Sequence, residues 1–461
     1  MPEALMLEQR RNWGQMAAVF VAGLAIALPL LAADRIWPFA VAAAALLIPA
    51  LLIKPVWGLY PLLVIITVIP PQGMVGILDY VLMPVDLYMM LYTLLWVWHK
   101  GIAGQSVRTS PLLVPISLVV FVRFLSVFAT PALIEGSLVS SLRYVEWLLV
   151  FLIVVDVARS DDVIRLLKIF LVVVAAQSML SIAQESLSVT LGGKIARGGT
   201  LGETGLLLAW LQVYALLVGV SLSHRAKTAE KRLAWWAYTV LVGMGLISTL
   251  GRTAWLTTAV ALLAYHWLDR STSFGFKAAR AVRDFVTAGV MLAVLFTMNH
   301  LLLGLALWRA ATVTSLGETF AWVERLTLWR VGLEMFRQHP ILGVGTGNYV
   351  DLLGGMVGAE DARTTHNAII GVLSETGLVG LLAYLFFASR VVAMVRRDLR
   401  LHTKSDLYPL LLPLGSTIVA LLFADWIGWT SFFVWSMCFL GLYVVLVREA
   451  SPGGGHHDRE P

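Results

Sequence analysis

The sequence has few charged residues and a single cysteine. Only 13% of its 461 residues are charged, whereas 59% are hydrophobic, and the mean hydropathy is +0.82. Soluble domains contain about 25% charged residues, so this composition excludes a soluble globular protein. The lone Cys438 excludes an intramolecular disulfide and a cysteine-ligated metal site.

Extended polar segments are also scarce, because apolar runs of about 18 residues, long enough to cross a bilayer, recur along the whole chain. We therefore expect an all-α, polytopic integral membrane protein with about 12–14 transmembrane helices. Arg10 and Arg11 precede an apolar run without a small-residue cleavage site, which predicts a first membrane helix rather than a removed signal peptide. The expected spans lie near residues 13–33, 37–53, 56–71, 82–98, 111–129, 137–157, 163–187, 203–223, 232–250, 253–268, 281–300, 366–390, 407–424 and 429–447.

The Lys and Arg residues gather in alternate connections between these spans. Basic connections remain on the cytoplasmic side of a membrane, so both termini are expected to be cytoplasmic. The same rule accounts for the isoelectric point near 9.4 without nucleic acid as a partner. The basic residues of the inner connections are Lys100, Arg108, Arg159, Arg165, Lys168, Arg225, Lys227, Lys231, Arg232, Arg270, Lys277, Arg280, Arg283, Arg396, Arg397, Arg400 and Lys404.

This orientation divides the chain into four parts. Residues 1–299 are expected to form an N-terminal bundle of transmembrane helices, and residues 366–447 the C-terminal transmembrane helices. Between them, residues 300–365 form one long outer loop with amphipathic helices, and loops of this length usually have a function. Residues 448–461, which are rich in glycine and charge, are expected to form a disordered cytoplasmic tail.

The stretch over residues 321–382 combines arginines, histidines, a Gly-rich turn and amphipathic helical spacing. In the helix expected over residues 321–338, Arg325 lies on the apolar stripe, where an arginine needs a buried carboxylate or an anionic ligand. Pro340 ends this helix, because the residue before a proline disfavours helical backbone. The stripe recurs at steps of three and four residues and consists of Trp322, Leu326, Trp329, Leu333 and Phe336.

A Gly-rich turn follows at residues 343–348, with Gly343, Gly345 and Gly347 preceding Asn348. Such a turn can direct backbone N–H groups toward phosphate oxygens. It can also be a tight turn that closes the loop, and both interpretations stay open from the sequence.

His366 and Asn367 open the next expected span, with Thr364 and Thr365 as candidate N-caps. The helix dipole favours a neutral imidazole at this end, and a neutral imidazole can accept a proton. His366 is therefore a candidate general base at the outer boundary of the membrane. Glu375, about two and a half turns further, is either functional or paired with a membrane arginine.

Arginines also occur at two places on the outer side, against the charge bias of the connections. Arg252 and Arg197 suggest a polyanion such as a lipid-linked diphosphate, because guanidinium groups bind phosphate through two parallel hydrogen bonds. Contact with lipid head groups is the alternative. Arg123, Arg143 and Glu146 lie within apolar runs, and we interpret them mainly as structural intramembrane pairs, with a lipid pathway as the alternative.

Together these residues resemble the O-antigen ligases of Gram-negative inner membranes, within a larger family that includes O-antigen polymerases and protein O-oligosaccharyltransferases. The resemblance covers roughly residues 200–390. It rests on Gly251-Arg252, Arg325-x-x-x-Trp329, Pro340-x-x-Gly343-x-Gly345-x-Gly347-Asn348, and His366-Asn367 running into Glu375-Thr376-Gly377-Leu378-Val379-Gly380.

The resemblance implies a metal-independent, inverting glycosyl transfer on the periplasmic side of a bacterial inner membrane, without a cofactor. The donor would be an O-antigen glycan on undecaprenyl diphosphate, and the acceptor a sugar hydroxyl of the lipid A-core, with membrane lipids as the other partners. The segment around Arg197 departs from the family pattern, because Gly202-Glu203-Thr204 replaces an Asn-rich step. The implied roles are catalysis for His366, diphosphate binding for Arg252, Arg325 and Arg197, and support for Asn367, Gly345, Gly347, Asn348 and Glu375.

Two alternatives remain open. An O-antigen polymerase would use the same donor with a second lipid-linked glycan as acceptor, but it would be expected to have two sizeable arginine-rich outer loops. This chain has one long loop and a short one at residues 186–202. A transporter of lipid-linked glycans is less favoured, because internal symmetry is lacking. Asp351, Glu360 and Asp361 are scattered on a Gly-rich loop, so no metal site is expected.

Overall fold

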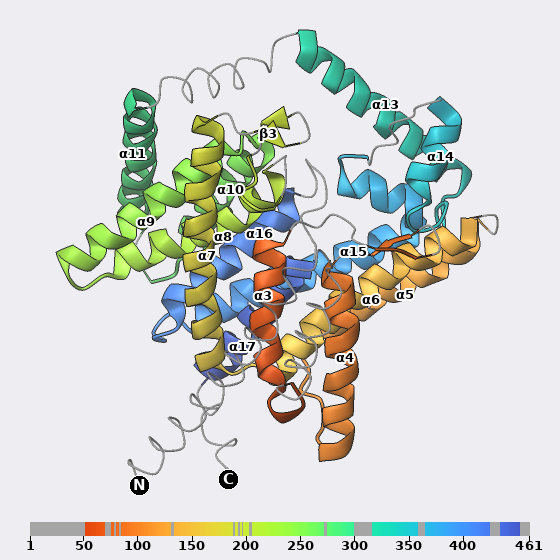
Figure 1. Ribbon diagram of the computed structural model, residues 1–461, viewed down its shortest axis with the longest axis horizontal. Coiled ribbons are helices and arrows are strands. Elements are labelled where there is room, and N and C mark those ends of the chain that lie inside the picture. Colours follow the sequence, from red (N-terminus) through yellow and green to blue (C-terminus); the bar gives the residue numbers. More distant parts are fainter. Residues whose placement is uncertain are drawn as a thin grey trace, which may run out of the picture. The chain divides into compact units, whose positions relative to one another are not determined.

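The computed structural model shows a helical protein divided into two compact units (Figure 1). The first expected span, at residues 13–33, lies outside the described residues, as does most of the second. The chain is described over residues 51–69, 75–77, 80–82, 84–130, 133–187, 190–191, 194–195, 197–201, 205–271, 274–298, 316–357, 365–424 and 434–451.

The first unit includes described residues 51–62 and 88–107. It contains the 3₁₀ helix η1 (Pro55–Gly58), the start of α3 (Leu59–Val68) and most of α4 (Pro84–Ala103). Within this unit the hydroxyl of Tyr88 donates to the carbonyl of Gly58 at 2.6 Å. The hydroxyl of Tyr92 donates to the carbonyl of Pro55 at 2.7 Å, so two tyrosines of α4 hold η1 in place.

The second unit contains the remaining helices and carries all the predicted site residues. The all-α class is confirmed, with the addition of two short antiparallel hairpins that were not expected, β1 (Val75–Ile77) with β2 (Tyr80–Leu82) and β3 (Thr190–Leu191) with β4 (Lys194–Ile195). Its helices are α5 (Leu113–Ser126), η2 (Val127–Ala129), α6 (Ile134–Val157), α7 (Ser160–Ser186), α8 (Leu206–Arg225), α9 (Ala229–Ser248), α10 (Arg252–Leu268), α11 (Phe274–Met298), α13 (Leu316–Gln338), α14 (Asn348–Val357), α15 (Ala368–Leu401), α16 (Tyr408–Ala424) and α17 (Val434–Ala450).

Four helices of the described chain, α6, α7, α8 and α15, are long and apolar enough to cross a membrane. Shorter apolar helices cover residues 55–68, 113–129 and 408–424. These helices agree with a membrane protein, whereas the full number of spans and the outer position of residues 300–365 stay predictions. α17 continues to Ala450, and Arg448 donates to the carbonyls of Val155 and Ala158. Residues 452–461 of the expected tail lie outside the described residues.

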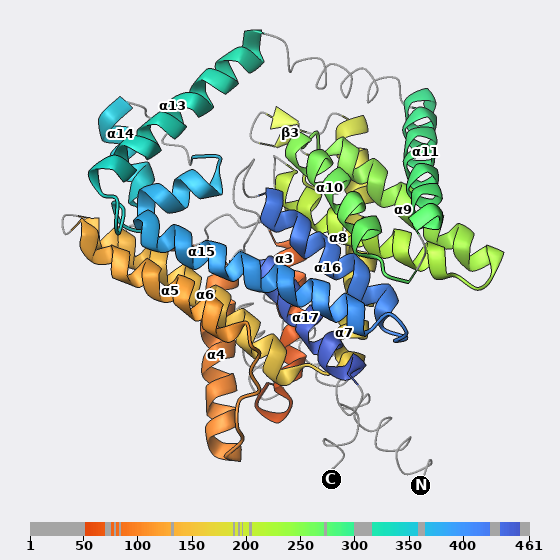
Figure 2. The same cartoon turned by 180° about the vertical axis from the view of Figure 1, so that it is seen from behind.

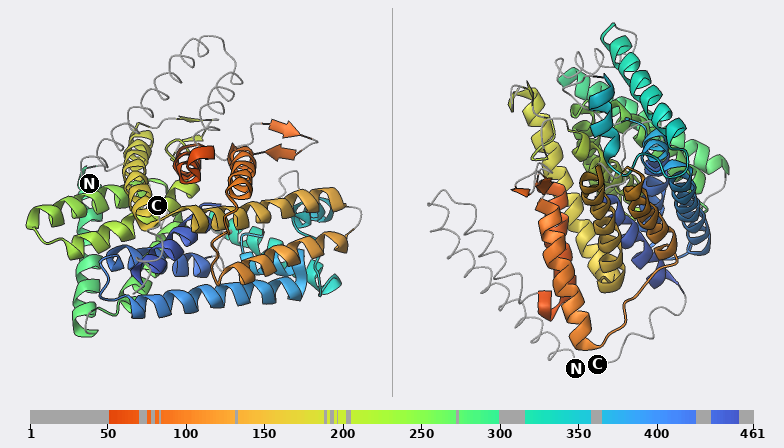
Figure 3. Two further views of the ribbon diagram at one scale, coloured as in Figure 1. Left: turned by 90° about the horizontal axis from the view of Figure 1, so that it is seen from below. Right: turned by 90° about the vertical axis from the view of Figure 1, so that its right-hand side faces the viewer.

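α8 forms the interior of the second unit. Its most apolar stretch of 18 residues is 83% buried inside the protein, whereas the corresponding stretches of α6 and α15 are each 33% buried. Because protein surrounds α8, this helix is apolar on all its faces. The Tyr214 ring of α8 stacks on Phe439 of α17 with 4.2 Å between the centroids. Elsewhere in the second unit, α15 runs beside α5 (Figure 3). α13 and α14 pack against α15, near its first residues (Figure 2).

The helix ends test two expectations. α13 ends at Gln338, directly before His339 and Pro340, as predicted. The N-cap of α15 is Asn367, whose side chain accepts the N–H of Ile370 at 3.1 Å, so the prediction of a threonine cap was wrong. Thr365 lies two residues before this N-cap, and its hydroxyl donates instead to the carbonyl of Asn367 at 2.7 Å.

The predicted apolar stripe of α13 was partly wrong. Leu326 and Leu333 are 56% and 43% exposed, whereas Leu328 and Met335 are buried. The difference arises because the partners come from the turn after α13 and from α14, and these contact the neighbouring face of the helix. The resulting cluster joins Leu328 and Met335 to Val344, Tyr349 and Leu353.

Candidate functional site

α15 is broken at Gly377, where φ is +64° and ψ is −160°. A break in an apolar helix frees backbone groups that are costly to leave unpaired away from water. The segment that follows α13 pairs with these groups through four hydrogen bonds. They run from the N–H of Leu378 to the carbonyl of Pro340 (2.9 Å), Val379 to Ile341 (3.3 Å), Val344 to Ser374 (2.8 Å) and Gly345 to Glu375 (2.9 Å).

Glycine is required on both sides of this contact. A Cβ on Gly377 would collide with the carbonyl of Ile341, and a Cβ on Gly343 would collide with the backbone between Ser374 and Glu375. Both glycines also have positive φ, which other residues rarely adopt. The two glycine-containing motifs of the sequence are therefore two halves of one backbone contact.

The N–H groups of the Gly-rich turn are occupied by the protein itself. Those of Val344 and Gly345 bond to α15, and that of Thr346 donates to the hydroxyl of Ser126 at 3.2 Å. The N–H of Gly347 donates to the carboxylate of Glu375, and the N–H of Asn348 donates to the carbonyl of Gly345 at 3.2 Å. Of the two interpretations left open by the sequence, the geometry supports a tight turn rather than a phosphate cradle.

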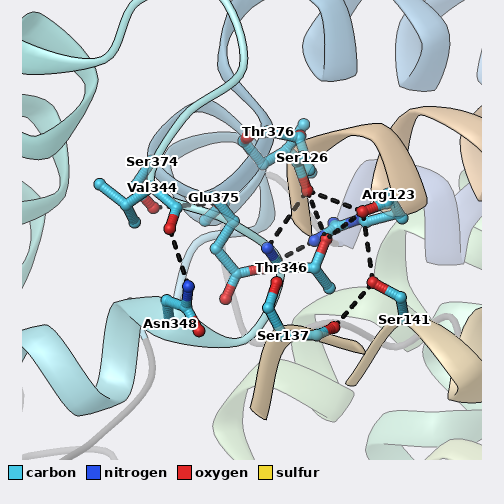
Figure 4. A network of polar contacts seen from close by, with 12 residues as sticks. Arg123, Ser126, Ser137, Ser141, Val344, Thr346, Asn348, Ser374, Glu375 and Thr376 are labelled. Carbon is cyan, nitrogen blue, oxygen red and sulfur yellow. Dashed lines mark hydrogen bonds and ion pairs between the residues drawn. The ribbon is translucent and has the colours of Figure 1, made fainter. Parts of the chain in front are cut away.

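An intramembrane ion pair fixes the turn to a third helix. Nη1 of Arg123 in α5 lies 2.6 Å from Oε2 of Glu375 (Figure 4), and the two side chains are only 8% and 17% exposed. The guanidinium carbon of Arg123 also lies 4.4 Å from the ring centroid of Tyr144. The sequence left Glu375 either functional or paired with an arginine, and the structure shows the pair.

Hydroxyl groups complete this network. The carbonyl of Arg123 accepts the hydroxyls of Ser126 (2.8 Å), Ser141 (3.2 Å) and Thr346 (3.2 Å). Sequence reasoning did not select these residues, since a serine in an apolar helix or a threonine in a turn gives no signal of where its hydroxyl points. The expected pair of Arg143 and Glu146 has a third member. The carboxyl of Glu146 hydrogen-bonds to Asp86 in addition to its electrostatic interaction with Arg143.

His366 lies immediately before the N-cap of α15 and has φ of +50°. This backbone conformation is uncommon for a residue other than glycine and is found often at functional sites. Contacts on both sides maintain it, since the indole N–H of Trp329 donates to the carbonyl of Thr365 at 2.9 Å and Asn367 caps the helix. The half-buried His366 is therefore held at the N-terminal end of a short helical segment that runs from Ala368 to the break.

Arg325 and Arg252 lie on different helices. Arg325 is half-buried on α13, one turn before Trp329, so the Trp329–Thr365 contact connects its helix to the His366 segment. Arg252 is the first residue of α10 and is also half-buried. Its diphosphate role stays a prediction, as does that of Arg325.

Arg197 has a carboxylate partner inside the protein. Its Nε lies 2.6 Å from Oε2 of Glu185, whose side chain is fully buried. Sequence reasoning missed Glu185, although Gln177, Ser181 and Glu185 recur every four residues along α7 and form a polar stripe on an apolar helix. Two side chains of this face, Gln177 and Gln184, hold the backbone of residues 199–200.

Within the ranges that the structure describes, no group of three His, Cys, Asp or Glu side chains is placed to hold a metal ion. Glu360 and Asp361 lie outside those ranges. Metal independence therefore remains a prediction.

The apolar helices and the broken α15 define a helical membrane protein in which two glycine-containing motifs contact each other through their backbones. Residues 237–385 match the family described as O-Antigen ligase, and this segment contains Arg252, Arg325, the Gly-rich turn, His366 and Glu375. This match confirms the resemblance to O-antigen ligases over that segment and implies a glycosyltransferase-type activity. No curated protein matches the chain.

Proposed function

We propose that the protein is an O-antigen ligase that transfers a glycan from undecaprenyl diphosphate to a sugar hydroxyl of the lipid A-core. The reaction takes place on the periplasmic face of the bacterial inner membrane. The observation that carries this proposal is His366 with φ of +50°, placed between the Trp329–Thr365 contact and the Asn367 cap. A histidine maintained in this way at a helix N-terminus is positioned to take a proton from an acceptor hydroxyl.

In the proposed reaction, the neutral imidazole of His366 accepts the proton of the acceptor hydroxyl as its oxygen attacks the anomeric carbon. The bond between that carbon and the diphosphate oxygen breaks, and the diphosphate leaves with the electron pair. One displacement inverts the anomeric centre. No energy source beyond the donor bond is needed.

Arginines stabilise the negative charge that develops on the leaving diphosphate. Removing one such contact typically costs about 3 kcal/mol of transition-state stabilisation. Arg252 and Arg325 are assigned this role, because guanidinium groups bind phosphate oxygens in pairs and require no metal ion. Arg197 is assigned a smaller part, since Glu185 already balances its charge.

The helix dipole of the segment between Ala368 and the break at Gly377 supports the same chemistry. Its positive end faces the His366 side, where it favours a bound anion and disfavours the protonated imidazole. A discontinuous membrane helix whose N-terminus points at an anionic group is a recurrent design in membrane proteins.

The test is a reconstituted transfer assay with purified protein, undecaprenyl-diphosphate glycan and lipid A-core in the presence of EDTA. The variant His366→Ala is expected to lose about 100-fold or more of the activity. The control His339→Ala removes an exposed histidine of the same loop and is expected to retain activity. Arg325→Gln and the control Arg337→Gln, which changes a 78% exposed side chain of the same helix, form a second pair.

Three outcomes contradict the proposal. Activity retained by His366→Ala removes the general-base assignment, and activity lost in EDTA removes metal independence. Longer lipid-linked glycan in place of glycosylated lipid A identifies the alternative, an O-antigen polymerase with the same donor. The family match does not separate these two enzymes, so this product decides between them.

A further inference from the structure

Three arginines from separate elements have contacts near the C-terminal end of α10. The guanidinium carbon of Arg225, at the end of α8, lies 4.9 Å from the ring centroid of Tyr408, and its Nη2 donates to Ser271 at 3.1 Å. The backbone N–H of Arg270 donates to the hydroxyl of the same Tyr408 at 3.0 Å. The guanidinium carbon of Arg396, on α15, lies 5.2 Å from the ring centroid of Trp267, one turn before Arg270.

Asp269, a carboxylate at the same helix end, already has hydrogen-bond partners within the protein. Asp269 is 2% exposed and accepts hydrogen bonds from the N–H and hydroxyl of Ser271 and from the hydroxyl of Tyr408, while Arg280 lies 3.5 Å away. Burial alone would raise the pKa of Asp269, but the hydrogen bonds from Ser271 hold this pKa below its usual value. Arg225 also stabilises this carboxylate electrostatically, but in the described part of the chain its ion pair within 4.0 Å is with Arg280 and not with Arg225, Arg270 or Arg396.

The three arginines lack a carboxylate at ion-pair distance in the described part of the chain. Arg225, Arg270 and Arg396 are exposed, and in the described part of the chain none of them forms an ion pair with a carboxylate. An exposed guanidinium without a carboxylate binds phosphate oxygens well, because its planar donors match them in pairs.

Two exposed aromatic rings of this region contact guanidinium groups, Trp267 that of Arg396 and Phe276 that of Arg280. Trp267 is 57% exposed, and Phe276 is 61% exposed with the guanidinium carbon of Arg280 at 5.3 Å from its ring centroid. Tryptophan concentrates at the level of lipid head groups, where the ring contacts apolar chains and its edge contacts water. A guanidinium group stacked on an exposed ring can therefore bind a lipid phosphate while the ring contacts the acyl chain.

We propose that the end of α10 binds the head group of an anionic phospholipid, with its phosphate held by Arg225, Arg270 and Arg396 and an acyl chain lying along Trp267. Basic pockets between membrane helices on the cytoplasmic side bind such head groups. This site lies in the predicted inner connections, at the opposite side from His366, and it does not depend on the proposed transferase activity.

The test measures lipid binding by the purified full-length protein in detergent after removal of bound lipid. Phosphatidylglycerol is expected to remain bound in native mass spectra and to raise the melting temperature, because a ligand that binds the folded state stabilises it. Phosphatidylcholine with the same acyl chains is expected to do neither. Inorganic phosphate alone is the third arm, and it separates a lipid site from a site for free phosphate.

Two triple variants separate a specific site from the general positive charge of this side. Arg225→Gln/Arg270→Gln/Arg396→Gln is expected to weaken phosphatidylglycerol binding by about tenfold or more. The control Lys227→Gln/Lys231→Gln/Arg232→Gln removes the same number of exposed charges from the neighbouring connection and is expected to change binding by less than about twofold. Should the first variant fail to fold, Arg396→Gln alone takes its place, with an expected loss of about threefold.

Equal weakening in both triple variants would overturn the proposal, because the arginines would then act only through the net charge of the inner side. Equal retention of phosphatidylglycerol and phosphatidylcholine would also overturn it. Binding of inorganic phosphate with the same sensitivity to the variants would show a site for a soluble phosphate compound and not for a lipid.

Discussion

Nη1 of Arg123 lies 2.6 Å from Oε2 of Glu375, and this ion pair joins α5 to the residue two positions before the break in α15. The same carboxylate receives the N–H of Gly347. A single intramembrane pair therefore links α5, the Gly-rich turn and the helical segment that begins next to His366. The consequence is that the position of the candidate base depends on charges that are more than two helical turns away from it.

Replacing Glu375 by Gln is expected to destabilise the protein by about 3–5 kcal/mol, because the buried guanidinium of Arg123 would lose its counter-charge. Thermal or denaturant unfolding in micelles measures this change. The control is Glu334→Gln, whose pair with Arg337 is exposed, and a change below about 0.5 kcal/mol is expected there. The double variant Arg123→Leu/Glu375→Gln is expected to recover part of the loss; equal stability of Glu375→Gln and wild type would contradict the account.

Alanine at Gly377 or Gly343 is expected to separate the Gly-rich turn from α15. Each Cβ would collide with backbone atoms of the other segment, and each residue would keep an unfavourable positive φ. We expect a loss of more than about 2 kcal/mol in unfolding free energy for either variant. Gly289→Ala, where a Cβ meets no atom within 4 Å, is the control and is expected to be neutral or slightly stabilising. Unchanged stability of Gly377→Ala would show that the break tolerates a side chain.

Trp329→Phe removes the indole N–H that holds Thr365 while it preserves most of the ring. Because one hydrogen bond is lost, stability is expected to fall by about 1 kcal/mol. Transfer activity should fall further, through kcat rather than KM, since the His366 segment loses one of its two anchors. Tyr238→Phe removes a hydrogen bond to a carbonyl of α7 and should cost similar stability without the kcat effect. Equal kcat values for the two variants would argue against a positioning role for Trp329.

Arg197 and Glu185 can be separated from the diphosphate site by a paired experiment. Arg197→Gln alone leaves the fully buried Glu185 without its partner, so both stability and activity are expected to fall. In the double variant Arg197→Gln/Glu185→Gln, no unpaired charge remains, and folding and most of the transfer activity should return. Arg252→Gln is expected to fold yet lose about 100-fold in activity. A folded but inactive double variant would instead restore Arg197 to the diphosphate site.

Several features of the site followed from local sequence alone. Pro340 predicted the end of α13, and the apolar runs predicted the helical class, because both effects depend on residues close together in the chain. The spacing of Arg325 and Trp329 placed them on one helical face. The resemblance to O-antigen ligases rested on short motifs, and the family match over residues 237–385 agrees with it.

Other features required the tertiary structure, since they join residues far apart in the sequence. The sequence could not tell that Glu375 is paired with Arg123, 252 positions earlier, or that the exposed-looking turn binds the break in α15. The sequence also predicted that Leu326 and Leu333 of α13 would be buried, whereas the buried residues are Leu328 and Met335 on the adjacent face. Which of two adjacent apolar faces is buried depends on the segment that packs against the helix.

The sequence by itself determined that this chain is a helical membrane protein with a polar, arginine-bearing stretch around His366, because hydropathy and helix periodicity are local properties. Only the tertiary structure decided the function of the glycines. Gly343 and Gly377 occur in separate motifs, and nothing local shows that their backbones touch. The physical reason is that a broken membrane helix must find hydrogen-bond partners outside itself, and only the folded chain brings those partners within reach.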